Sequence, residues 1–515
     1  MIESATFVDI GFRAIPPQFI MPLQAGGRIL SAPTPAPLIS VQRSGMAGSA
    51  MCRHFSTLLC YDSWRPERPY LYMPSTTTYT PPTSPEELKQ RISSKTARVC
   101  VVGLGYVGLP LAVEYAKAGF TVVGIDVSQS KVDSLNKGIS YIQDVPGEEV
   151  RELVEAGRLS ATTDFAAIAT LDTVNIAVPT PLRKTKDPDM SYVVSAAQAV
   201  ARHAHPGILV ILESTTYPGT TDELLLPIFE ATGLKVGQDF FLCFSPERVD
   251  PGNPHFQTKN IPKVVGGITP VCTEIGALFY SQALEHVVPV SSTRVAEMVK
   301  LLENTFRMIN IALVNELAIM CNRMNIDVWE IIDAAATKPF GFMPFYPGPG
   351  LGGHCIPIDP FYLSWKTKQS GIEARFIELA GYINGQMPQF VTDKIQDVLN
   401  EVTKPLRGSH LHILGVAYKK DIDDMRESPA LDVIHLLEKR GARVTYSDPF
   451  VASLVLEGKT FTSDNSDETL AAADCVVIIT NHSALDYTAV VEKARLIVDT
   501  RNALKGIQSD KIHRL

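Results

Sequence analysis

One short stretch near residue 100 constrains the fold of this chain more than any other feature. An apolar run, Val99 to Val102, leads directly into the glycine turn Gly103-Leu104-Gly105-Tyr106-Val107-Gly108. Helix-forming residues follow from Leu111 to Ala118, and a second apolar run, Thr121 to Ile125, ends at Asp126. Strand, glycine turn, helix, strand and acid in this order are typical of a βαβ unit that binds a dinucleotide. The sequence therefore predicts a Rossmann-like domain.

Each part of this unit has a chemical task. Glycines let the backbone approach a pyrophosphate at the N-terminus of the helix. The acid at the end of the second strand accepts the adenosine ribose hydroxyls and repels a 2′-phosphate, and no Arg directly follows Asp126, so the pattern favours NAD over NADP. The candidate cofactor-binding residues of the unit are Gly103, Gly105, Tyr106, Val107, Gly108 and Asp126.

Composition excludes several classes of protein. The net charge is -8, so no basic surface for nucleic acid is expected. The 8 cysteines show neither a disulfide framework nor the spacing of a metal site. No apolar run approaches the ~20 residues that cross a bilayer, and the N-terminus lacks the pattern of a secretion signal. We expect a cytoplasmic protein that contacts no membrane and holds no metal.

Residues 1–95 differ from the rest of the chain. The stretch from Thr76 to Pro85 is rich in Pro, Ser and Thr and has no hydrophobic period. Such a segment buries too little apolar surface to offset the entropy of ordering it. We expect a disordered extension, and Met73 is an alternative start of translation.

Polar residues follow three further predicted strands. The strands are Thr173 to Val178, Ile208 to Glu213 and Phe240 to Phe244. In a parallel sheet the carboxyl ends of the strands line the ligand crevice, although each polar residue alone could equally serve a turn or a helix cap. The candidates at these three ends are Thr180, Thr215, Glu247 and Arg248.

The region from Arg294 to Arg323 predicts one long amphipathic helix. Apolar residues recur there every three or four positions without Gly or Pro, which is the helical period. These residues are Val295, Met298, Leu302, Phe306, Ile309, Leu313 and Leu317. The helix is long enough to bridge two domains and to offer a dimer face. Lys300 and Asn304 lie four residues apart and therefore share one face of it.

A second α/β unit begins at His410. A strand, His410 to Leu414, leads into a turn that has one glycine, Gly415, rather than three. This difference predicts a Rossmann-like domain that holds something other than a dinucleotide, with Lys419, Arg426 and Arg501 on its loops as candidate phosphate ligands. The predicted fold is α/β, with two doubly wound Rossmann-like domains joined by a long central helical segment. The predicted boundaries are 96–292 for the first domain, 293–402 for the central segment and 403–515 for the second.

The loop from Gly348 to Pro360 concentrates glycines around one cysteine, Cys355, with an acid, Asp359, four residues later. Glycines allow a ligand to approach the backbone closely, a thiol can attack a substrate, and a carboxylate can handle protons. A single cysteine is more often a small buried hydrophobe than a nucleophile. The loop indicates a catalytic cysteine only in combination with the other motifs.

These motifs together resemble the UDP-glucose/GDP-mannose dehydrogenase family, over about residues 97–515. The closest likeness is to its bacterial UDP-N-acetylglucosamine 6-dehydrogenases. The stretches that carry the likeness are Glu213 to Thr220, Lys300 to Asn304, Ala336 to Phe342 and the Cys355 loop. The resemblance implies an NAD domain, a central dimerisation segment and a C-terminal UDP-binding domain. It also implies that two NAD⁺ oxidise the C6 alcohol of a UDP-sugar to a carboxylate.

The resemblance assigns roles by position. Cys355 would form a thiohemiacetal with the C6 aldehyde, which is then oxidised to a thioester. Lys300 and Asn304 would stabilise charge on the oxygen at C6, Asp359 and Thr215 would organise a proton-accepting water, and Glu247 would be the base in thioester hydrolysis. Thr180, Thr215 and Arg426 would complete the NAD site. The implied substrate-binding residues are Glu247, Arg248, Lys300, Asn304, Tyr346, Gly348, Gly350, Leu351, Gly352, Lys419 and Arg501.

One departure from the family pattern bears on the substrate. The UDP-glucose enzymes have an Arg, supplied by the neighbouring subunit, before the glycine loop, whereas this chain reads Thr337-Lys338-Pro339-Phe340. This departure argues against UDP-glucose and leaves the contacts around the sugar C2 substituent open, while the likeness to the UDP-N-acetylglucosamine branch makes UDP-N-acetylglucosamine the expected substrate. UDP-N-acetylmannosamine, its C2 epimer, and a catalytically idle sensor of NAD and nucleotide sugars are the alternatives.

Overall fold

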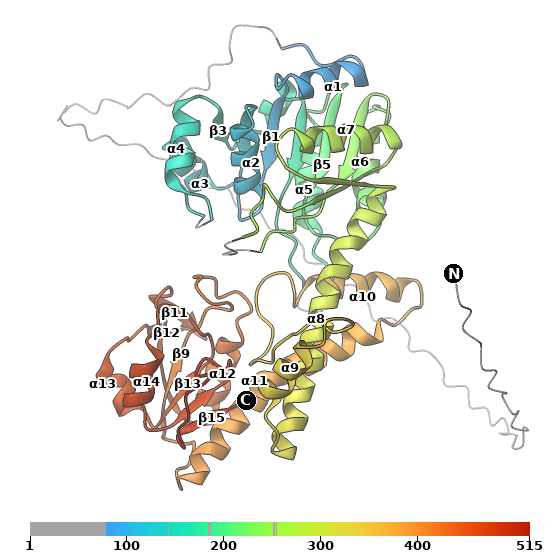
Figure 1. Cartoon of the computed structure of the whole chain (residues 1–515). Helices are drawn as coiled ribbons and strands as arrows, with labels where there is room; N and C mark the ends of the chain where they lie inside the picture. The colour runs from blue at the N-terminus through green and yellow to red at the C-terminus, as the bar shows by residue number, and fades with distance from the viewer. Residues whose placement is uncertain (1–78, 143, 184–186, 251–252, 254) are drawn as a thin grey trace, which may run out of the picture. The chain divides into compact units, whose positions relative to one another are not determined.

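The computed structural model describes residues 79–142, 144–183, 187–250, 253 and 255–515. These residues form two α/β sheets and a set of long central helices (Figure 1). The strand predicted at residues 240–244 has those bounds, and the other predicted strands are found within two residues of their expected ends. The predicted α/β class with two Rossmann-like sheets and a long central helical segment is confirmed.

The N-terminal sheet has eight strands in the order β3-β2-β1-β4-β5-β6-β7-β8. The strands are β1 Arg98–Val102, β2 Thr121–Ile125, β3 Leu159–Thr162, β4 Thr173–Ile176, β5 Ile208–Leu212, β6 Phe240–Phe244, β7 Lys263–Gly267 and β8 Val287–Val290. The helical elements are α2 Gly108–Lys117, α3 Gln129–Asn136, α4 Gly147–Glu155, η1 Phe165–Thr170, α5 Ser191–Ala201, η2 Thr221–Leu225, α6 Leu226–Glu230 and α7 Pro270–Ser281. Residues from both faces of the sheet are buried, which explains the nearly continuous apolar runs of β1, β5 and β6.

One strand of this sheet runs against its neighbour. β6 pairs with β7 in antiparallel register, with Cys243 opposite Gly267, while every other pair in the sheet is parallel. The start of β7 therefore lies at the same edge as the carboxyl ends of β5 and β6. This edge carries the ligand crevice in doubly wound sheets.

The prediction of disorder up to residue 95 is wrong for its last part. Helix α1, Pro85–Ser93, packs against α7, and Leu88 and Ile92 are fully buried. Ser84 caps the helix by accepting a hydrogen bond from the amide of Glu87, and Pro85 occupies the first turn. Because Pro and Ser are favoured at a helix start, the composition that suggested disorder marks a helix N-terminus instead. The prediction for residues 1–78 lies outside the described residues.

Four central helices follow: α8 Thr293–Met324, α9 Val328–Ala336, α10 Asp359–Gln369 and α11 Arg375–Glu401. The predicted long helix is confirmed, but its apolar stripe is mostly not buried. Leu302 is 60% exposed and Leu313 59%, whereas Lys300, Asn304 and Asn315 are buried. α8 thus buries a mixed face, in which polar residues stand among apolar ones such as Leu301 and Met308, and leaves a stripe of apolar residues exposed.

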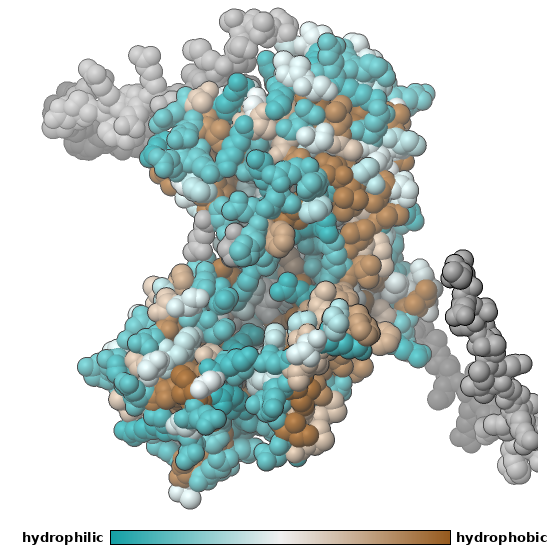
Figure 2. Space-filling view, viewed as in Figure 1, coloured by the Kyte–Doolittle hydropathy of each residue, from teal (hydrophilic) through white to brown (hydrophobic). Residues whose placement is uncertain are grey.

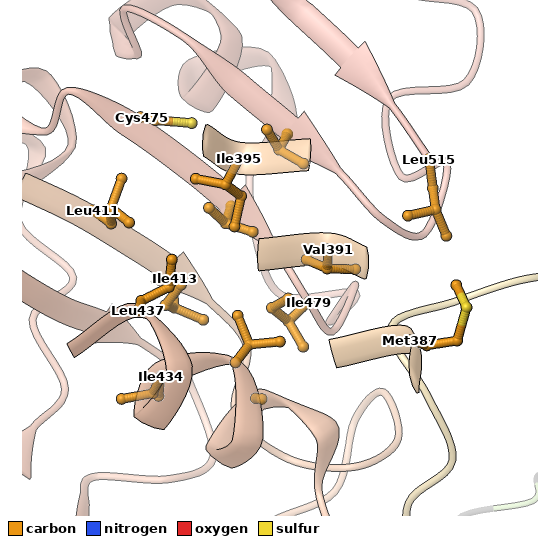
Figure 3. Packing of buried hydrophobic residues seen from close by; sticks show 14 of the residues in the cluster. Met387, Val391, Ile395, Leu411, Ile413, Ile434, Leu437, Cys475, Ile479 and Leu515 are labelled. Atoms are coloured by element: carbon orange, nitrogen blue, oxygen red, sulfur yellow. The ribbon is translucent and has the colours of Figure 1, made fainter. Parts of the chain in front are cut away.

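The C-terminal sheet has five parallel strands in the order β10-β9-β13-β14-β15. They are β9 His410–Leu414, β10 Arg443–Ser447, β13 Cys475–Ile478, β14 Ile497–Asp499 and β15 Ile512–Arg514, with helices α12 Pro429–Lys439, α13 Asp467–Ala472 and α14 Tyr487–Lys493. A small hairpin, β11 Ser453–Leu456 and β12 Lys459–Thr462, pairs separately. In Figure 3, Val391 and Ile395 of α11 lie over Ile413 of β9, so the central helices and this sheet share one core.

None of the described helices is long and apolar enough to span a membrane.

Candidate active site

A pocket of about 1100 Å³ gathers the residues that the sequence analysis proposed. Every predicted catalytic, cofactor-binding and substrate-binding residue lines it except Gly108. The lining comes from the turn after β1, from the ends of β4, β5 and β6, from α8, from the Cys355 loop and from loops of the C-terminal sheet. Residues that lie hundreds of positions apart in sequence thus face one cavity.

The glycine turn after β1 has the geometry that a dinucleotide requires. Gly103 has φ +91°, and a Cβ there would lie 2.3 Å from the carbonyl oxygen of Ala177. Gly105 has no atom within 4 Å of such a Cβ, so its surface is open. Gly108, which was predicted to bind cofactor, does not line the pocket; a Cβ there would lie 1.8 Å from the Gly103 carbonyl oxygen. Its task is to let α2 pack closely on the turn.

Asp126 lies at the end of β2 with its carboxylate facing the turn. It accepts hydrogen bonds from the amides of Leu104 and Ser128, both at 2.9 Å, and Lys131 Nζ lies 3.2 Å away. The side chain is held in one place by these contacts and lines the pocket. A ribose would meet a carboxylate that is already oriented, which fits the cofactor implied by the motif.

Arg426 joins the glycine turn from the C-terminal domain. Its guanidinium lies 5.2 Å from the centre of the Tyr106 ring, and Asp424 holds it through hydrogen bonds of 2.7 to 3.0 Å. A planar guanidinium stacked on an aromatic ring has little freedom left. The contact places a fixed positive charge beside the turn where a pyrophosphate would bind.

Cys355 lies four residues before Asp359, the first residue of α10. Its carbonyl oxygen accepts hydrogen bonds from the amides of Ile358, at 3.1 Å, and Asp359, at 2.8 Å, so the loop is tied to the helix start. The residue is exposed and its side chain opens onto the pocket. Desolvation by the surrounding pocket walls, assisted by the Asp359 carboxylate, raises the pKa of the Cys355 thiol to about 11, while Lys300 acts in the opposite direction. The resting group is therefore a thiol at neutral pH.

Asp359 and Asn304 form a buried pair beside this thiol. Asn304 Nδ2 donates to Asp359 Oδ2 at 2.6 Å, and the Asp359 side chain is almost inaccessible. Burial raises the pKa of Asp359 to about 7, against the lowering effects of Lys300 and of the Asn304 hydrogen bond. A carboxyl group poised near neutral pH can accept and return a proton under physiological conditions.

Glu247 is anchored at the end of β6. Its Oε1 accepts hydrogen bonds from the amides of Arg248, at 2.7 Å, and Val249, at 2.6 Å. Arg248 forms two hydrogen bonds with the Glu303 carboxylate of α8, at 2.6 and 3.3 Å. The loop after β6 is therefore fixed both to itself and to the helix that carries Lys300.

The other end of the pocket is formed around Arg501. Its Nε donates to the Ile479 carbonyl at 2.9 Å, and burial lowers the pKa of this guanidinium to about 10. A Cβ on Gly348 would lie 2.4 Å from the Arg501 guanidinium, so a larger residue there would have to displace that side chain. The amide of Gly348 donates to Asn315 Oδ1 of α8 at 2.9 Å. The predicted substrate loop and the predicted phosphate ligand are in contact.

Tyr346 and Lys419 extend this end of the pocket. The Tyr346 ring is stacked on Trp329, with ring centres 6.1 Å apart, and its hydroxyl donates to Asp333 at 3.0 Å. Lys419 Nζ donates to Asp250 Oδ1 of the N-terminal domain at 2.7 Å. An aromatic stack beside fixed cations suits a base attached to phosphates.

Some pocket residues were missed by the sequence analysis. Glu303, Arg307 and Ile311 line the cavity from α8, and Trp329, His354 and Tyr418 line it from neighbouring segments. A signal for Arg307 was available, because it is three residues after Asn304 and seven after Lys300 and so lies on the same helical face. No local pattern distinguishes Trp329, whose indole nitrogen is buried without a hydrogen-bond partner in the described part of the chain.

Comparison with known proteins agrees with this arrangement. Residues 97–284 match the model of the NAD binding domain of the UDP-glucose/GDP-mannose dehydrogenase family, residues 294–386 its central domain, and residues 412–506 its UDP binding domain. The chain is 37% identical over 361 residues, 70% of this chain and 84% of the relative, to UDP-N-acetyl-D-glucosamine 6-dehydrogenase of Pseudomonas aeruginosa. It is 38% identical over 405 residues, 75% and 94% respectively, to UDP-N-acetyl-D-mannosamine dehydrogenase of Escherichia coli K12.

A solved structure agrees as well. UDP-D-ManNAc dehydrogenase from Pyrococcus horikoshii superposes with a TM-score of 0.74 at 32% sequence identity, covering 81% of this chain and 98% of that protein. Three family models in the right order and relatives that match along most of their length leave no other assignment. The chain belongs to the UDP-glucose/GDP-mannose dehydrogenase family of NAD-dependent nucleotide-sugar dehydrogenases.

Proposed function

We propose that this protein oxidises the C6 hydroxyl of UDP-N-acetylglucosamine to a carboxylate in two NAD⁺-dependent steps, through a thioester on Cys355. The observation that carries the proposal is the convergence of Cys355, Lys300, Asp359 and Glu247 on the pocket that also holds the dinucleotide turn. The overall reaction consumes one alcohol, two NAD⁺ and one water, and yields one carboxylate, two NADH and three protons. A thiol is needed because the aldehyde must become tetrahedral again before it can lose a second hydride.

The chain supplies a complete NAD site for this chemistry. Gly103, Gly105 and Arg426 would hold the pyrophosphate, Asp126 the ribose, and Thr180 the part of the cofactor beyond the end of β4. Bound there, NAD⁺ supplies the hydride acceptor for both oxidation steps. The backbone amides of Leu104 and Ser128 hold the Asp126 carboxylate in place, and its negative charge disfavours a 2′-phosphate.

The first oxidation needs a proton acceptor and a charge stabiliser at C6. The Lys300 ammonium and the Asn304 amide would stabilise the developing alkoxide. Asp359 would organise, with Thr215, the water that removes the hydroxyl proton. The pKa of Asp359 near 7 suits this task because the group can be ionised at neutral pH and still bind a proton.

The second oxidation proceeds on the thiohemiacetal. The Cys355 sulfur adds to the aldehyde carbon as the thiol loses its proton, and Lys300 stabilises the new oxyanion. The thioester that results is attacked by a water whose proton Glu247 accepts, and the thiolate of Cys355 leaves. The pKa of about 11 means that sulfur becomes nucleophilic only when a cation or a base assists it.

The UDP moiety would lie at the Arg501 end. Arg501 and Lys419 would bind the diphosphate, and the loop from Tyr346 to Leu351 would hold the uridine, with Gly348, Gly350 and Gly352 keeping the backbone accessible. Arg248, paired with Glu303, would lie along the sugar. This order places C6 at Lys300 and the nucleotide farther along α8, where Asn315 contacts the Gly348 amide.

The choice of sugar is the finer part of the proposal. The UDP-N-acetylglucosamine enzyme of Pseudomonas aeruginosa and the UDP-N-acetylmannosamine enzyme of Escherichia coli are nearly equally similar to this chain, so the C2 epimer is the second candidate. The segment Thr337-Lys338-Pro339-Phe340 lacks the Arg of the UDP-glucose enzymes. That absence argues against UDP-glucose, and the similarity to the enzymes for the two N-acetylated sugars supports an N-acetylated substrate.

We also propose that two copies associate through the exposed stripe of α8. Val295, Met298, Leu302 and Phe306 are each 39 to 60% exposed on this helix. Figure 2 shows hydrophobic surface along its course. Contiguous apolar surface on a helix costs free energy unless a partner covers it. Leu302→Glu should shift the protein to a smaller species in light scattering, whereas Lys89→Glu, far from the stripe, should not.

Two measurements test the proposed function. Purified enzyme should produce NADH with UDP-N-acetylglucosamine faster than with UDP-N-acetylmannosamine or UDP-glucose, and two NADH should form per sugar. Glu247→Gln should give a burst of about two NADH per active site and a covalent adduct in the intact mass. Cys355→Ser should give neither. Turnover of Cys355→Ser at the wild-type rate would refute the covalent route.

A further inference from the structure

A buried ion pair lies in the wall of the pocket, outside every role assigned above. Lys263 Nζ and Glu213 Oε2 are 2.6 Å apart; Lys263 is 6% exposed and Glu213 is fully buried. Removing two charges from water is costly, and apolar residues of similar volume often stabilise a fold as well as such a pair does. The ion pair is therefore better explained by a functional role than by a contribution to the stability of the fold.

The pairing of Lys263 with Glu213 depends on β7 being antiparallel to β6. Glu213 directly follows β5, and Lys263 is the first residue of β7. Because β7 is antiparallel to β6, its first residue lies at the edge where β5 and β6 end. If β7 were parallel to β6, Lys263 would lie at the far edge of the sheet.

Glu213 is fully engaged by its surroundings. Its Oε1 accepts hydrogen bonds from Asn175 Nδ2, at 2.8 Å, and from the Tyr280 hydroxyl, while Oε2 faces Lys263. Lys263 Nζ also lies 5.4 Å from the centre of the Tyr280 ring. Contacts on both oxygens hold this carboxylate still, and the lysine that it pairs with is held with it.

Lys263 in turn contacts the segment that carries Glu247. Its Nζ donates to the Pro246 carbonyl at 3.1 Å and lies 3.9 Å from Glu247 Oε2. The other oxygen of Glu247 is occupied by the amides of Arg248 and Val249. One oxygen of Glu247 is thus fixed by the backbone, and the oxygen left for a water faces the Lys263 ammonium.

We propose that Lys263, held by Glu213, is a positioning residue for Glu247. It keeps the free carboxylate oxygen directed at the water that attacks the Cys355 thioester. This inference rests on the proposed role of Glu247 in hydrolysis. It predicts that loss of the lysine slows hydrolysis selectively, because neither hydride transfer nor substrate binding uses the Glu247 carboxylate as a base.

The test compares two variants that preserve the packing. Lys263→Met alone would leave Glu213 charged and unpaired in the interior, so the main variant is the double change Lys263→Met with Glu213→Gln. Glu213→Gln alone is the comparison variant: Gln can still accept hydrogen bonds from Asn175 and Tyr280, but its amide nitrogen then faces Lys263, which stays in place without its anionic partner. Stopped-flow NADH formation separates the burst, which reports the two oxidations, from the steady rate, which reports hydrolysis.

The double variant should give a burst of about two NADH at the wild-type rate, followed by a steady rate lower by roughly 10- to 100-fold, the usual cost of a misplaced group. The acyl-enzyme should accumulate in the intact mass, KM for both substrates should change by less than about 3-fold, and the comparison variant should hydrolyse faster than the double variant. A double variant that hydrolyses as fast as wild type would overturn the proposal, as would a burst slowed by the same factor as the steady rate. Failure of Glu247→Gln to accumulate acyl-enzyme would instead refute the proposed function itself.

Discussion

The two Rossmann-like domains build their first turn in the same way. Gly103 follows β1 with φ +91°, and Gly415 follows β9 with φ +81°. A Cβ at either glycine would lie 2.3 Å from a carbonyl oxygen at the end of the neighbouring strand, that of Ala177 in one domain and that of Thr480 in the other. The shared glycine therefore reflects close backbone packing in the sheet and not the identity of the ligand.

The acids that end the second strand show where the domains differ. Asp448, after β10, accepts hydrogen bonds from the amides of Val416, at 2.7 Å, and Ala417, at 3.2 Å, and pairs with His482 Nε2 at 3.0 Å. It is 2% exposed and does not line the pocket, whereas Asp126 does. Both acids accept hydrogen bonds from amides of their own domain, but of the two only Asp126 lines the pocket, so only the N-terminal acid can meet a ribose there.

Gly103→Ala should have the largest effect of the predicted substitutions, and it should affect only the ligand of the N-terminal domain. The new Cβ meets the Ala177 carbonyl and must displace the turn that would face the pyrophosphate, so NAD⁺ affinity should fall by about 100-fold, or about 3 kcal/mol. UDP affinity should be unchanged. Gly415→Ala should do the reverse, because its clash lies in the C-terminal domain. Calorimetric titration of each variant with NAD⁺ and with UDP measures both effects; equal losses of both ligands in either variant would show that the turns are not independent.

Asp126→Ala should mainly change the cofactor preference, whereas Asp448→Ala should mainly change the stability of the fold. The first should narrow the preference for NAD⁺ over NADP⁺ by about 10-fold, since repulsion of the 2′-phosphate is lost. Its loss of stability should be smaller than that of the second, because Asp126 lines the pocket, from which water can replace the carboxylate at the amides of Leu104 and Ser128. The second should leave the cofactor preference unchanged and lower the free energy of unfolding by about 3 kcal/mol, because buried amides and His482 lose their acceptor. Steady-state rates with both cofactors and urea unfolding give the two readings. A stability loss of that size in Asp126→Ala would remove the distinction.

Much of the difference between the two domains could be predicted from the sequence, because it depends on local sequence patterns. The glycine turn, its flanking strands and Asp126 lie within thirty residues of one another, and the single glycine of the second turn correctly indicated a different ligand. The length of α8 followed from its period. Which face of α8 is buried did not follow, because the helical period identifies an apolar stripe but not what covers it.

The features that were missed depend on contacts between distant residues. The antiparallel direction of β7 has no local signature, since a five-residue apolar strand reads the same in either direction. The pairing of Glu213 with Lys263, fifty residues later, follows only from that direction. Helix α1 was missed because its sequence is mostly polar. Its two buried residues, Leu88 and Ile92, are recognisable as core residues only once α7 is present.

Arg426 and Arg501 extend the comparison to the charges that each ligand meets. Arg426 stacks on Tyr106 of the dinucleotide turn, and Arg501 packs on Gly348 of the substrate loop. Arg426→Gln should therefore raise KM for NAD⁺ by about 10-fold, and Arg501→Gln should raise KM for the UDP-sugar by a similar factor, the worth of a charge-assisted hydrogen bond. Initial rates with one substrate varied at a time measure both constants. Interchanged effects would mean that the two arginines serve the opposite ligands.

The central segment has no counterpart in either Rossmann-like domain. The smallest predicted effect concerns its cysteine, Cys355. The Asp359 carboxylate helps to raise the pKa of this thiol, and the pKa of Asp359 is itself about 7. Above pH 7 Asp359 is an anion and opposes thiolate formation, so Asp359→Asn should increase the rate of iodoacetamide alkylation at pH 8 by roughly 5-fold. Below pH 6 Asp359 is protonated in the wild type, and the two rates should converge. Glu303→Gln removes a carboxylate from another part of the pocket and should leave the alkylation rate unchanged. An equal rate for Asp359→Asn and wild type at pH 8, measured by mass spectrometry of the Cys355 peptide, would show that burial alone keeps the thiol protonated.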